Sequence, residues 1–245
     1  MALNPDSTVP LYVQIKEYLR QQIENGVYPL GARLPSEREL SRTFQVSRMT
    51  ARQALQLLAS DGFVSARVGK GTFVKKPRID QELRFLTSFT EDIQQRGMTP
   101  TSRVILATLR PAPPDVAGPL KISAGAEIVL LSRVRLADGE PIAWEICHIN
   151  HRLCPGILDH HDFSRESLYH VLREEYGHHL IWADQLISAR MPSREERKAL
   201  DLDANTPVLS LTRVTYTDHD QPVEYVLSVY RCDRYQLRTV LRYSK

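Results

Sequence analysis

The chain has little cysteine, with only Cys147, Cys154 and Cys232 among its 245 residues. Three is an odd number and none of them belongs to a C-x-x-C pair, which argues against a disulfide framework and a structural zinc site. A long hydrophobic run is also missing, because the longest aliphatic run, Ile128–Leu131, is far shorter than the ~20 residues that span a bilayer. The N-terminus has no basic stretch followed by an apolar one. We therefore expect no secretion signal, no membrane partner and a reducing cytoplasmic location.

Charge of one sign is not in excess overall, but it is unevenly distributed. The net charge is +3, yet residues 1–78 hold 12 Lys and Arg against 6 Asp and Glu (+6), whereas residues 79–245 hold 20 against 23 (−3). This asymmetry suggests that the basic first third meets a polyanion and the remainder has another task. The length predicts one large or two modest domains, and 42% hydrophobic residues argue against a wholly disordered, collagenous or coiled-coil chain.

The first third carries helix signals followed by strand signals. Ser36 and Glu39 form the pattern of a capping box, and Ser47 is placed to cap the next helix. A glycine-rich turn over 68–71 separates two short strand patterns. The predicted elements are helices over 10–25, 37–44 and 47–61 and strands over 63–67 and 72–75.

This order of elements is the layout of a winged helix-turn-helix. The third helix would enter the major groove of DNA with its N-terminal residues. Arginine can bond a guanine edge or grip a phosphate, and glycine at the tip of the wing lets the backbone approach a groove closely. The alternative for each arginine is a solvated helix face. The predicted DNA-binding residues are Arg38, Ser47, Arg48, Thr50, Arg52, Gly69 and Lys70.

The remainder of the chain predicts a mixed α+β domain. Residues 8–76 form the predicted DNA-binding domain, residues 77–82 a polar linker, and residues 83–243 the second domain. The second domain is expected to have strands near 102–110, 127–137, 141–150, 180–190, 207–217 and 222–232, with helices over 88–97, 166–176 and 193–200.

Two arginines in this second domain predict an anion site. Arg133 and Arg135 alternate on one strand, so both side chains project to the same face, where they repel each other unless an anion lies between them. A phosphate or a carboxylate is the obvious candidate. The alternative is a cross-strand ion pair with Glu145.

Further candidates surround this anion site. Ser88, Phe89 and Thr90 lie at a predicted helix N-terminus, which favours anions. Ser167 and Tyr169 open another helix and offer hydroxyl donors. Glu145 and Glu224 suit the hydroxyls or the amine of a polar ligand, and Tyr230 offers a ring face and a hydroxyl, although for Glu224 and Tyr230 a plain strand surface is an equal alternative.

Cysteines and histidines near residue 150 raise the alternative of a metal site, which the sequence does not favour. His148 and His151 lie near Cys147 and Cys154, but a strand that ends near residue 150 scatters the directions of their side chains. We therefore expect no metal and no cofactor.

The motifs of the first domain resemble those of the GntR family of bacterial transcription regulators. Four blocks carry the resemblance in family order, namely Pro35–Leu40, Val46–Leu55, Gly62–Val64 and Gly69–Val74. The resemblance implies that Arg38, Arg48 and Arg52 contact DNA, that Gly69 lies in the wing, and that a homodimer binds a two-fold symmetric double-stranded operator.

The second domain resembles the HutC-type subfamily, whose sensor is the UTRA domain with an antiparallel sheet like that of chorismate lyase. The resemblance rests on residues 86–92, Arg96–Met98, Arg133–Arg135, Glu145, and Glu224 with Tyr230 and Arg231. Within the subfamily the positions are most similar to regulators of N-acetylglucosamine use, whose effectors are phosphorylated amino sugars. That likeness implies phosphate contacts from Thr90, Arg133, Arg135, Ser167 and Tyr169, and sugar contacts from Phe89, Glu145, Glu224 and Tyr230.

Two other functions stay open on the sequence alone. One is an enzyme of the chorismate-lyase type with a vestigial DNA-binding domain, since the same fold also hosts catalysis. The other is an architectural DNA-binding protein without a ligand. Against the enzyme, the candidate residues offer no acid–base pair beyond Glu145 and Glu224. We therefore expect a ligand-responsive regulator, a repressor, whose effector is a small anion such as N-acetylglucosamine-6-phosphate, glucosamine-6-phosphate or another carboxylate or sugar phosphate.

Overall fold

The structure is a computed structural model that describes residues 3–5, 7–67, 69–75 and 78–243. The chain divides into two compact units, Met1–Arg78 and Ile79–Lys245. Each unit has its own clusters of buried hydrophobic residues.

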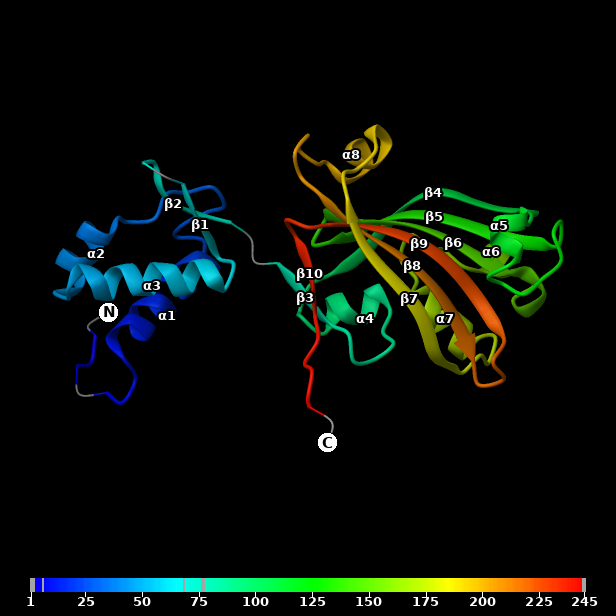
Figure 1. Ribbon diagram of the computed structural model, residues 1–245, viewed down its shortest axis with the longest axis horizontal. Coiled ribbons are helices and arrows are strands. Elements are labelled where there is room, and N and C mark those ends of the chain that lie inside the picture. The colour runs from blue at the N-terminus through cyan, green and yellow to red at the C-terminus, as the bar shows by residue number, and fades with distance from the viewer. Residues whose placement is uncertain (1–2, 6, 68, 76–77, 244–245) are drawn as a thin grey trace. The chain divides into compact units, whose positions relative to one another are not determined.

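The first unit has three helices followed by a two-stranded hairpin, in the predicted order. The elements are α1 (Leu11–Glu24), α2 (Glu37–Phe44), α3 (Arg48–Ser60), β1 (Val64–Arg67) and β2 (Gly71–Val74) (Figure 1). The two strands pair antiparallel, with Val64 opposite Val74 and Arg67 opposite Gly71. The predicted winged helix-turn-helix is confirmed.

Local sequence signals explain the boundary between α2 and α3. The predicted capping box is present, because the Ser36 hydroxyl accepts a hydrogen bond from the Glu39 backbone N–H (3.3 Å) and the Glu39 carboxylate accepts one from the Ser36 N–H (2.7 Å). The helix ends at Gln45, which has a left-handed backbone with φ of 52°. The next residue but one, Ser47, already caps α3, so the turn between the two helices is tight.

The core of the first unit is built from one face of each helix together with the wing. The apolar stripe of α1 buries Ile15 and Leu19, as its spacing predicts. The buried cluster consists of Ile15, Leu19, Leu34, Leu40, Ala51, Ala54, Leu55, Leu58, Val64 and Val74. Because both strands contribute, the hairpin is packed onto the helices rather than free of them.

The second unit is organised around a six-stranded antiparallel sheet. Its strands run in the spatial order β4-β5-β6-β9-β8-β7, so β9 lies between β6 and β8. The strands are β4 (Pro100–Pro111), β5 (Glu127–Ala137), β6 (Glu140–Asn150), β7 (Leu180–Arg190), β8 (Val208–Thr217) and β9 (Pro222–Arg231). All six strands predicted from the alternating pattern are confirmed.

A hairpin turn joins β5 to β6. Asp138 and Gly139 are the two loop residues, and both have a positive φ, 50° and 77°. A two-residue loop with this backbone matches the twist of the flanking strands and favours Asp-Gly.

Short helices cover both faces of the sheet. They are α4 (Phe89–Gln94), α5 (Pro114–Ala117), a 3₁₀ turn (His151–Leu153), α6 (Ile157–His160), α7 (Leu168–Glu174) and α8 (Arg194–Leu200). The helices α4 and α7 lie on one side of the sheet and α8 lies on the other (Figure 1). The connection between β4 and β5 contains the single helical turn α5.

Hydrophobic side chains fix this arrangement. Phe89 and Ile93 of α4 belong to the same buried cluster as Ala143 and Tyr230 of the sheet. Leu168, Val171 and Leu172 of α7 pack with Leu131, Cys147 and Val226, which project from the same face. Leu200 of α8 packs with Val134, Val208 and Val229 on the opposite face.

The predicted linker, residues 77–82, is corrected at its C-terminal end. Residues 76 and 77 lie outside the described residues, but Ile79–Glu82 form a strand, β3, which pairs in parallel with β10 (Tyr235–Arg238) near the C-terminus. Ile79 and Gln81 are buried and Asp80 and Glu82 are more exposed, so the segment has the alternation of a half-buried strand. Four residues were too few for this pattern to stand out in the sequence.

Candidate functional site

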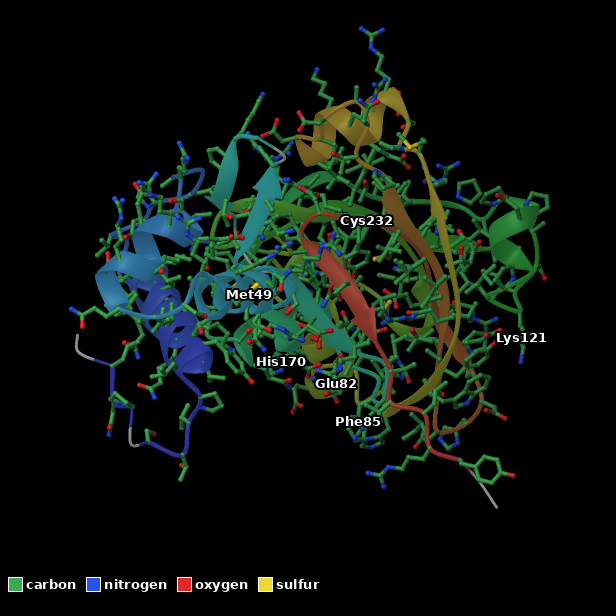
Figure 2. The ribbon with its side chains drawn as sticks, turned by 60° about the vertical axis from the view of Figure 1, so that its left-hand side comes forward. Met49, Glu82, Phe85, Lys121, His170 and Cys232 are labelled. Atoms are coloured by element: carbon green, nitrogen blue, oxygen red, sulfur yellow. The ribbon has the colours of Figure 1, made fainter. Side chains whose placement is uncertain are left out.

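The N-terminus of α3 presents a polar, cationic surface. Ser47 caps the helix, since its hydroxyl accepts a hydrogen bond from the Thr50 N–H (3.0 Å) and lies 2.9 Å from the Thr50 hydroxyl. Arg48 and Arg52 are exposed. Met49 is exposed as well and lies on the same helix (Figure 2). Because these three side chains are exposed, this end of the helix is available to a partner.

A hollow beside α3 gathers further cations. It is lined by Arg33, Leu34, Ser36, Glu37, Arg38, Arg48, Leu55, Gly71 and Thr72. Arg38 and Arg48 are predicted DNA-binding residues, whereas Arg33 is not among the predicted ones. Arg33 forms a β-bridge with Phe73 of the wing, and its Nε lies 2.8 Å from where a Cβ on Gly71 would be. Arg52 lies 3.9 Å from the Glu37 carboxylate.

The wing carries the remaining predicted DNA contacts. Gly69 and Lys70 are exposed at the turn between β1 and β2, whereas Val68 of the same turn lies outside the described residues. Gly69 has a φ of 70° and Gly71 a φ of 110°, conformations that favour glycine. The Arg67 guanidinium lies 4.8 Å from the centre of the Phe73 ring. All seven predicted DNA-binding residues thus occur on α2, on α3 with its cap, or at the wing turn, as expected; their contacts with DNA remain a prediction.

In the second unit, one face of the sheet forms the floor of a pocket between α4 and α7, here named the sheet pocket. Strand register explains its membership, because Arg133, Glu145, Ser228 and Leu211 lie side by side across four neighbouring strands. The pocket contains about 540 Å³ of space not filled by atoms, including its opening to solvent. Its lining is Gln81, Thr87, Ser88, Phe89, Asp92, Arg133, Arg135, Glu145, Ser167, Leu168, Tyr169, Gln185, Leu211, Arg213, Glu224, Val226, Ser228 and Tyr230.

A buried cluster of two arginines and one glutamate occupies one end of this pocket. The Glu145 carboxylate accepts hydrogen bonds from Arg135 Nη1 (2.9 Å) and Arg133 Nη2 (3.3 Å). Arg135 Nη2 also donates to the Thr90 hydroxyl (3.0 Å), and its guanidinium lies 4.5 Å from the centre of the Phe89 ring. Thr90 therefore touches the cluster, as its predicted role requires, although it is not among the pocket-lining residues.

The alternative interpretation of the two arginines, an ion pair with Glu145, is present in the structure but does not satisfy them. Arg133 is 1% exposed and Arg135 5%. Among the described residues, Arg133 Nε and Nη1 and Arg135 Nε have no hydrogen-bond partner. One carboxylate thus faces two guanidiniums and leaves three buried N–H-bearing atoms unpaired, which is costly in a protein interior.

The electrostatics of the cluster point the same way. Burial lowers the pKa of Arg133, and the positive charge of Arg135 lowers it further. Burial alone would raise the pKa of Glu145, but the charges of Arg135 and Arg133 outweigh it and hold that pKa below its ordinary value. Glu145 is therefore ionised, and a second anion would be stabilised here by the unpaired guanidinium atoms.

The other end of the pocket is a hydrogen-bond network around Glu224. Its carboxylate accepts from the Tyr169 hydroxyl (3.2 Å) and from the Thr215 hydroxyl (3.2 Å). Burial raises the pKa of Glu224, and the charge on Glu145 raises it further. The Gln185 amide oxygen accepts from Arg213 Nε (2.7 Å), which places one more guanidinium beside this network.

The predicted effector residues are thus brought together, but not all in the expected grouping. Ser88 and Ser167 line the pocket and also cap α4 and α7, respectively, so their hydroxyls already accept backbone N–H groups. Tyr169, predicted beside the phosphate, hydrogen-bonds at the Glu224 end. Tyr230 lines the pocket, with its ring 4.4 Å from that of Tyr235.

Several polar pocket residues were not predicted, namely Gln81, Thr87, Asp92, Gln185, Arg213 and Ser228. Gln185 and Arg213 lie directly opposite each other on β7 and β8. The alternation of side chains along β7 and β8 predicts which residues share a face with Gln185 and Arg213. What was missing is the strand order that brings β8 and β7 to the same side of β9.

The cysteines and histidines near residue 150 do not come together as a metal site among the described residues. Cys147 and Cys154 are buried in the hydrophobic cluster beneath α7, and burial raises the pKa of Cys154 to about 12. The His148 ring instead stacks on Tyr225 at 5.8 Å. In the parts of the chain that the structure describes, no group of three His, Cys, Asp or Glu residues is placed to hold a metal ion. Within those same parts, no helix has the length and apolar character needed to cross a membrane.

Comparisons with known proteins match both units. Residues 11–74 match the bacterial regulatory proteins of the gntR family, and residues 95–236 match the UTRA domain. The HTH-type transcriptional repressor NagR of Bacillus subtilis (strain 168) is 39% identical over 235 residues, which are 96% of each chain. The histidine utilization repressor of Pseudomonas putida is 30% identical over 240 residues, or 98% of this chain and 94% of that one. The crystal structure of PhnF from Mycobacterium smegmatis superposes with a TM-score of 0.82 at 30% identity, covering 94% of this chain and 100% of that one.

Proposed function

The chain belongs to the gntR family of bacterial regulatory proteins and carries a UTRA domain, and on this premise we propose that it is a homodimeric repressor whose operator binding is modulated by a phosphorylated amino sugar. That it is a DNA-binding transcription regulator, and not an enzyme, follows from the family itself. The chorismate-lyase type of enzyme considered from the sequence is therefore set aside. The similarity of this chain to a transcriptional repressor over 96% of its length supports the proposal that it represses transcription.

The unpaired guanidinium atoms of the sheet pocket carry the proposal for the effector. A phosphate or carboxylate oxygen is the partner that Arg133 Nε and Nη1 and Arg135 Nε lack among the described residues. The pocket extends beyond the two arginines to Glu224, Tyr169 and Arg213. A bare inorganic ion bound at the arginines would leave this polar part of the pocket without a partner. An anion with a polar body, such as a sugar phosphate, makes use of both ends.

The contacts proposed for the effector follow from these two ends. Arg133 and Arg135 bind the phosphate, with Thr90 and Ser167 beside them. Glu145 and Glu224 accept hydrogen bonds from hydroxyl or amine groups, and the rings of Phe89 and Tyr230 pack on the sugar. Tyr169 is proposed to turn its hydroxyl from Glu224 towards the ligand. Its hydrogen bond to Glu224 is then replaced by one to the phosphate.

An exposed apolar row on the opposite face of the sheet supports the dimer. Leu106, Leu227 and Leu186 are its exposed members. The partly buried Ile146 and Thr212 and the buried Ser132 complete the line across all six strands. Leu186 is 71% exposed and Leu106 46% in the single chain. A row of this kind on a soluble regulator suits a two-fold contact between identical faces, and two DNA-binding domains are needed to read a two-fold symmetric operator.

We expect the effector to act by a population shift. Ligand in the sheet pocket favours one arrangement of the chain segment that leads to the DNA-binding domain, and the spacing of the two recognition helices in that arrangement suits the operator less well. The proposed DNA contacts are those of the sequence analysis, with Arg33 added as a phosphate-binding candidate because it lines the same hollow as Arg38 and Arg48.

The experiment that tests the proposal is a titration of labelled promoter DNA from the protein's own gene neighbourhood with the full-length protein. It is done without ligand and with saturating glucosamine-6-phosphate, N-acetylglucosamine-6-phosphate, glucosamine or inorganic phosphate. We expect the two sugar phosphates to weaken operator binding by about 5- to 150-fold, and glucosamine and phosphate to change it little. Unchanged affinity with both sugar phosphates would count against the effector class, whereas a response to a carboxylate alone would replace it.

A further inference from the structure

The strand β3 is the first element of the second unit and lies close to the sheet pocket. It follows Arg78, the last residue of the first unit, without an intervening residue. It pairs only with β10 in the described chain, as a parallel two-stranded sheet separate from the main one (Figure 1). The strand ends at Glu82, and the chain then passes the exposed Phe85 before it enters α4 (Figure 2). β3 is thus the element of the second unit that is nearest in sequence to the DNA-binding domain.

Gln81 is the residue of β3 that lines the pocket. It is 5% exposed, and both halves of its amide are used. Its Nε2 donates to Asp92 Oδ2 (2.7 Å), and its Oε1 accepts from the Tyr235 hydroxyl (2.5 Å). Because the donor and the acceptor each have a fixed partner, the amide has one orientation that satisfies both.

The two hydrogen-bond partners of Gln81, Asp92 and Tyr235, are themselves connected to the pocket. Asp92 lines the pocket from α4, and its second oxygen accepts from the Thr87 hydroxyl (2.8 Å), another lining residue. The ring of Tyr235 lies 4.4 Å from that of Tyr230, which lines the pocket from β9. Arg96 of the segment after α4 donates to the backbone carbonyls of both Asp92 and Asp80. The orientation of the Gln81 amide therefore depends on side chains from α4, β9 and β10 at once.

We propose that Gln81 is the positioning residue that couples occupancy of the sheet pocket to the strand β3, and through it to the segment that leads to the DNA-binding domain. The proposal rests on the proposed function and names a residue for its regulation. A ligand hydroxyl or amine that competes for Asp92, or one that moves the Tyr230 ring and with it Tyr235, removes one partner of the amide. A buried amide that loses a partner favours a displacement of β3 that restores the hydrogen bond.

The physical measure of this role is a coupling factor, the ratio of operator dissociation constants with and without saturating ligand. A residue that only supports the pocket lowers ligand affinity but leaves this ratio intact once the pocket is saturated. A residue that only supports the fold lowers the melting temperature and leaves the ratio intact as well. Only a coupling residue moves the ratio itself.

The test uses the full-length protein and glucosamine-6-phosphate as the ligand. Gln81→Leu removes both hydrogen bonds at similar volume, and Tyr235→Phe removes one of them and keeps the ring. Gln185→Leu is the matched control, because Gln185 is also a pocket-lining glutamine but belongs to edge strand β7 and accepts from Arg213. Calorimetry gives each ligand affinity, so that saturation is ensured, and anisotropy of labelled promoter DNA gives each ratio.

We expect the wild type to have a coupling factor of about 5 to 150. The coupling factor of Gln81→Leu should lie within about twofold of unity, and that of Tyr235→Phe should be intermediate. The Gln185→Leu control should bind the ligand more weakly and keep the wild-type ratio. A folded Gln81→Leu protein that keeps the wild-type ratio overturns the proposal. If Gln81→Leu does not fold, an unchanged ratio in Tyr235→Phe overturns it instead. A wild-type ratio of one with every sugar phosphate is a failure of the proposed function, which this design separates from a failure of the coupling role.

Discussion

Replacing Arg133 by methionine separates a ligand-binding arginine from a structural one. The Arg133 guanidinium is almost fully buried, and two of its nitrogens have no partner among the described residues, while its contact with Glu145 is long at 3.3 Å. In Arg133→Met, Glu145 keeps its shorter hydrogen bond to Arg135, 2.9 Å, so no carboxylate is left unpaired. The variant therefore removes a poorly satisfied buried charge and only the longer of the two ion-pair contacts to Glu145.

The magnitude follows from the groups that are lost. An unpaired buried donor costs about 1–3 kcal/mol. Removing one partner of a buried ion pair is costly when it leaves the other charge uncompensated, but here Arg135 still pairs with Glu145. Against this stands the loss of one weak contact with Glu145. We expect the free energy of unfolding of the second unit to stay unchanged or to rise by up to about 2 kcal/mol. Sugar-phosphate binding should fall at least about 100-fold, as expected when a charge-assisted contact is lost.

Arg135→Met is the matched control. Arg135 makes the shorter hydrogen bond to Glu145, donates to Thr90 and packs on the Phe89 ring. Its loss leaves Glu145 with the long contact to Arg133 alone, so we expect destabilisation of about 3 kcal/mol. The assay is urea unfolding followed by tryptophan fluorescence, because both tryptophans, Trp144 and Trp182, lie in the second unit. Equal destabilisation by the two substitutions would refute the reasoning, since Arg133 would then be a satisfied structural ion.

Three further outcomes are expected. Arg48→Ala should relax the base preference of operator binding by about 1–3 kcal/mol, whereas Lys70→Ala should weaken binding to all duplexes alike; an intact ranking of operator variants in Arg48→Ala contradicts the assigned role. Glu224→Gln should stabilise the second unit increasingly as the pH rises above 4.5, the ordinary pKa of this carboxyl, because burial raises the pKa of Glu224 in the folded state and the wild type loses stability with rising pH. A difference from the wild type that stays constant in urea melts between acid and neutral pH contradicts this. Leu186→Glu should convert the proposed dimer to a monomer in sedimentation experiments, and a dimer of unchanged stability would remove the exposed apolar row from the proposed interface.

The first unit could be predicted almost completely because its signals are local. The capping box at Ser36, the cap at Ser47 and the glycines of the wing each fix a boundary within a few residues of themselves. The same holds for the six long strands, whose alternation and turn residues are readable along the chain. Such features need no knowledge of the tertiary fold.

The parts that escaped prediction depend on contacts between distant segments. The strand β3 pairs with β10, more than 150 residues away in sequence, and neither strand is longer than four residues. Gln185 and Arg213 reach the pocket only because β9 inserts between β6 and β8. By contrast, the placement of Arg133 and Arg135 on one face could be predicted, because the alternation of a strand holds wherever that strand lies. That an anion binds between them stays a prediction.

The most direct measurement is the affinity of the full-length protein for labelled promoter DNA as glucosamine-6-phosphate is added, for the wild type and Arg133→Met side by side. The account predicts that operator affinity falls with ligand in the wild type and stays constant in Arg133→Met, while both proteins bind the DNA equally well without ligand. A wild type that ignores the sugar phosphate, or a variant that still responds at the same concentrations, would contradict it.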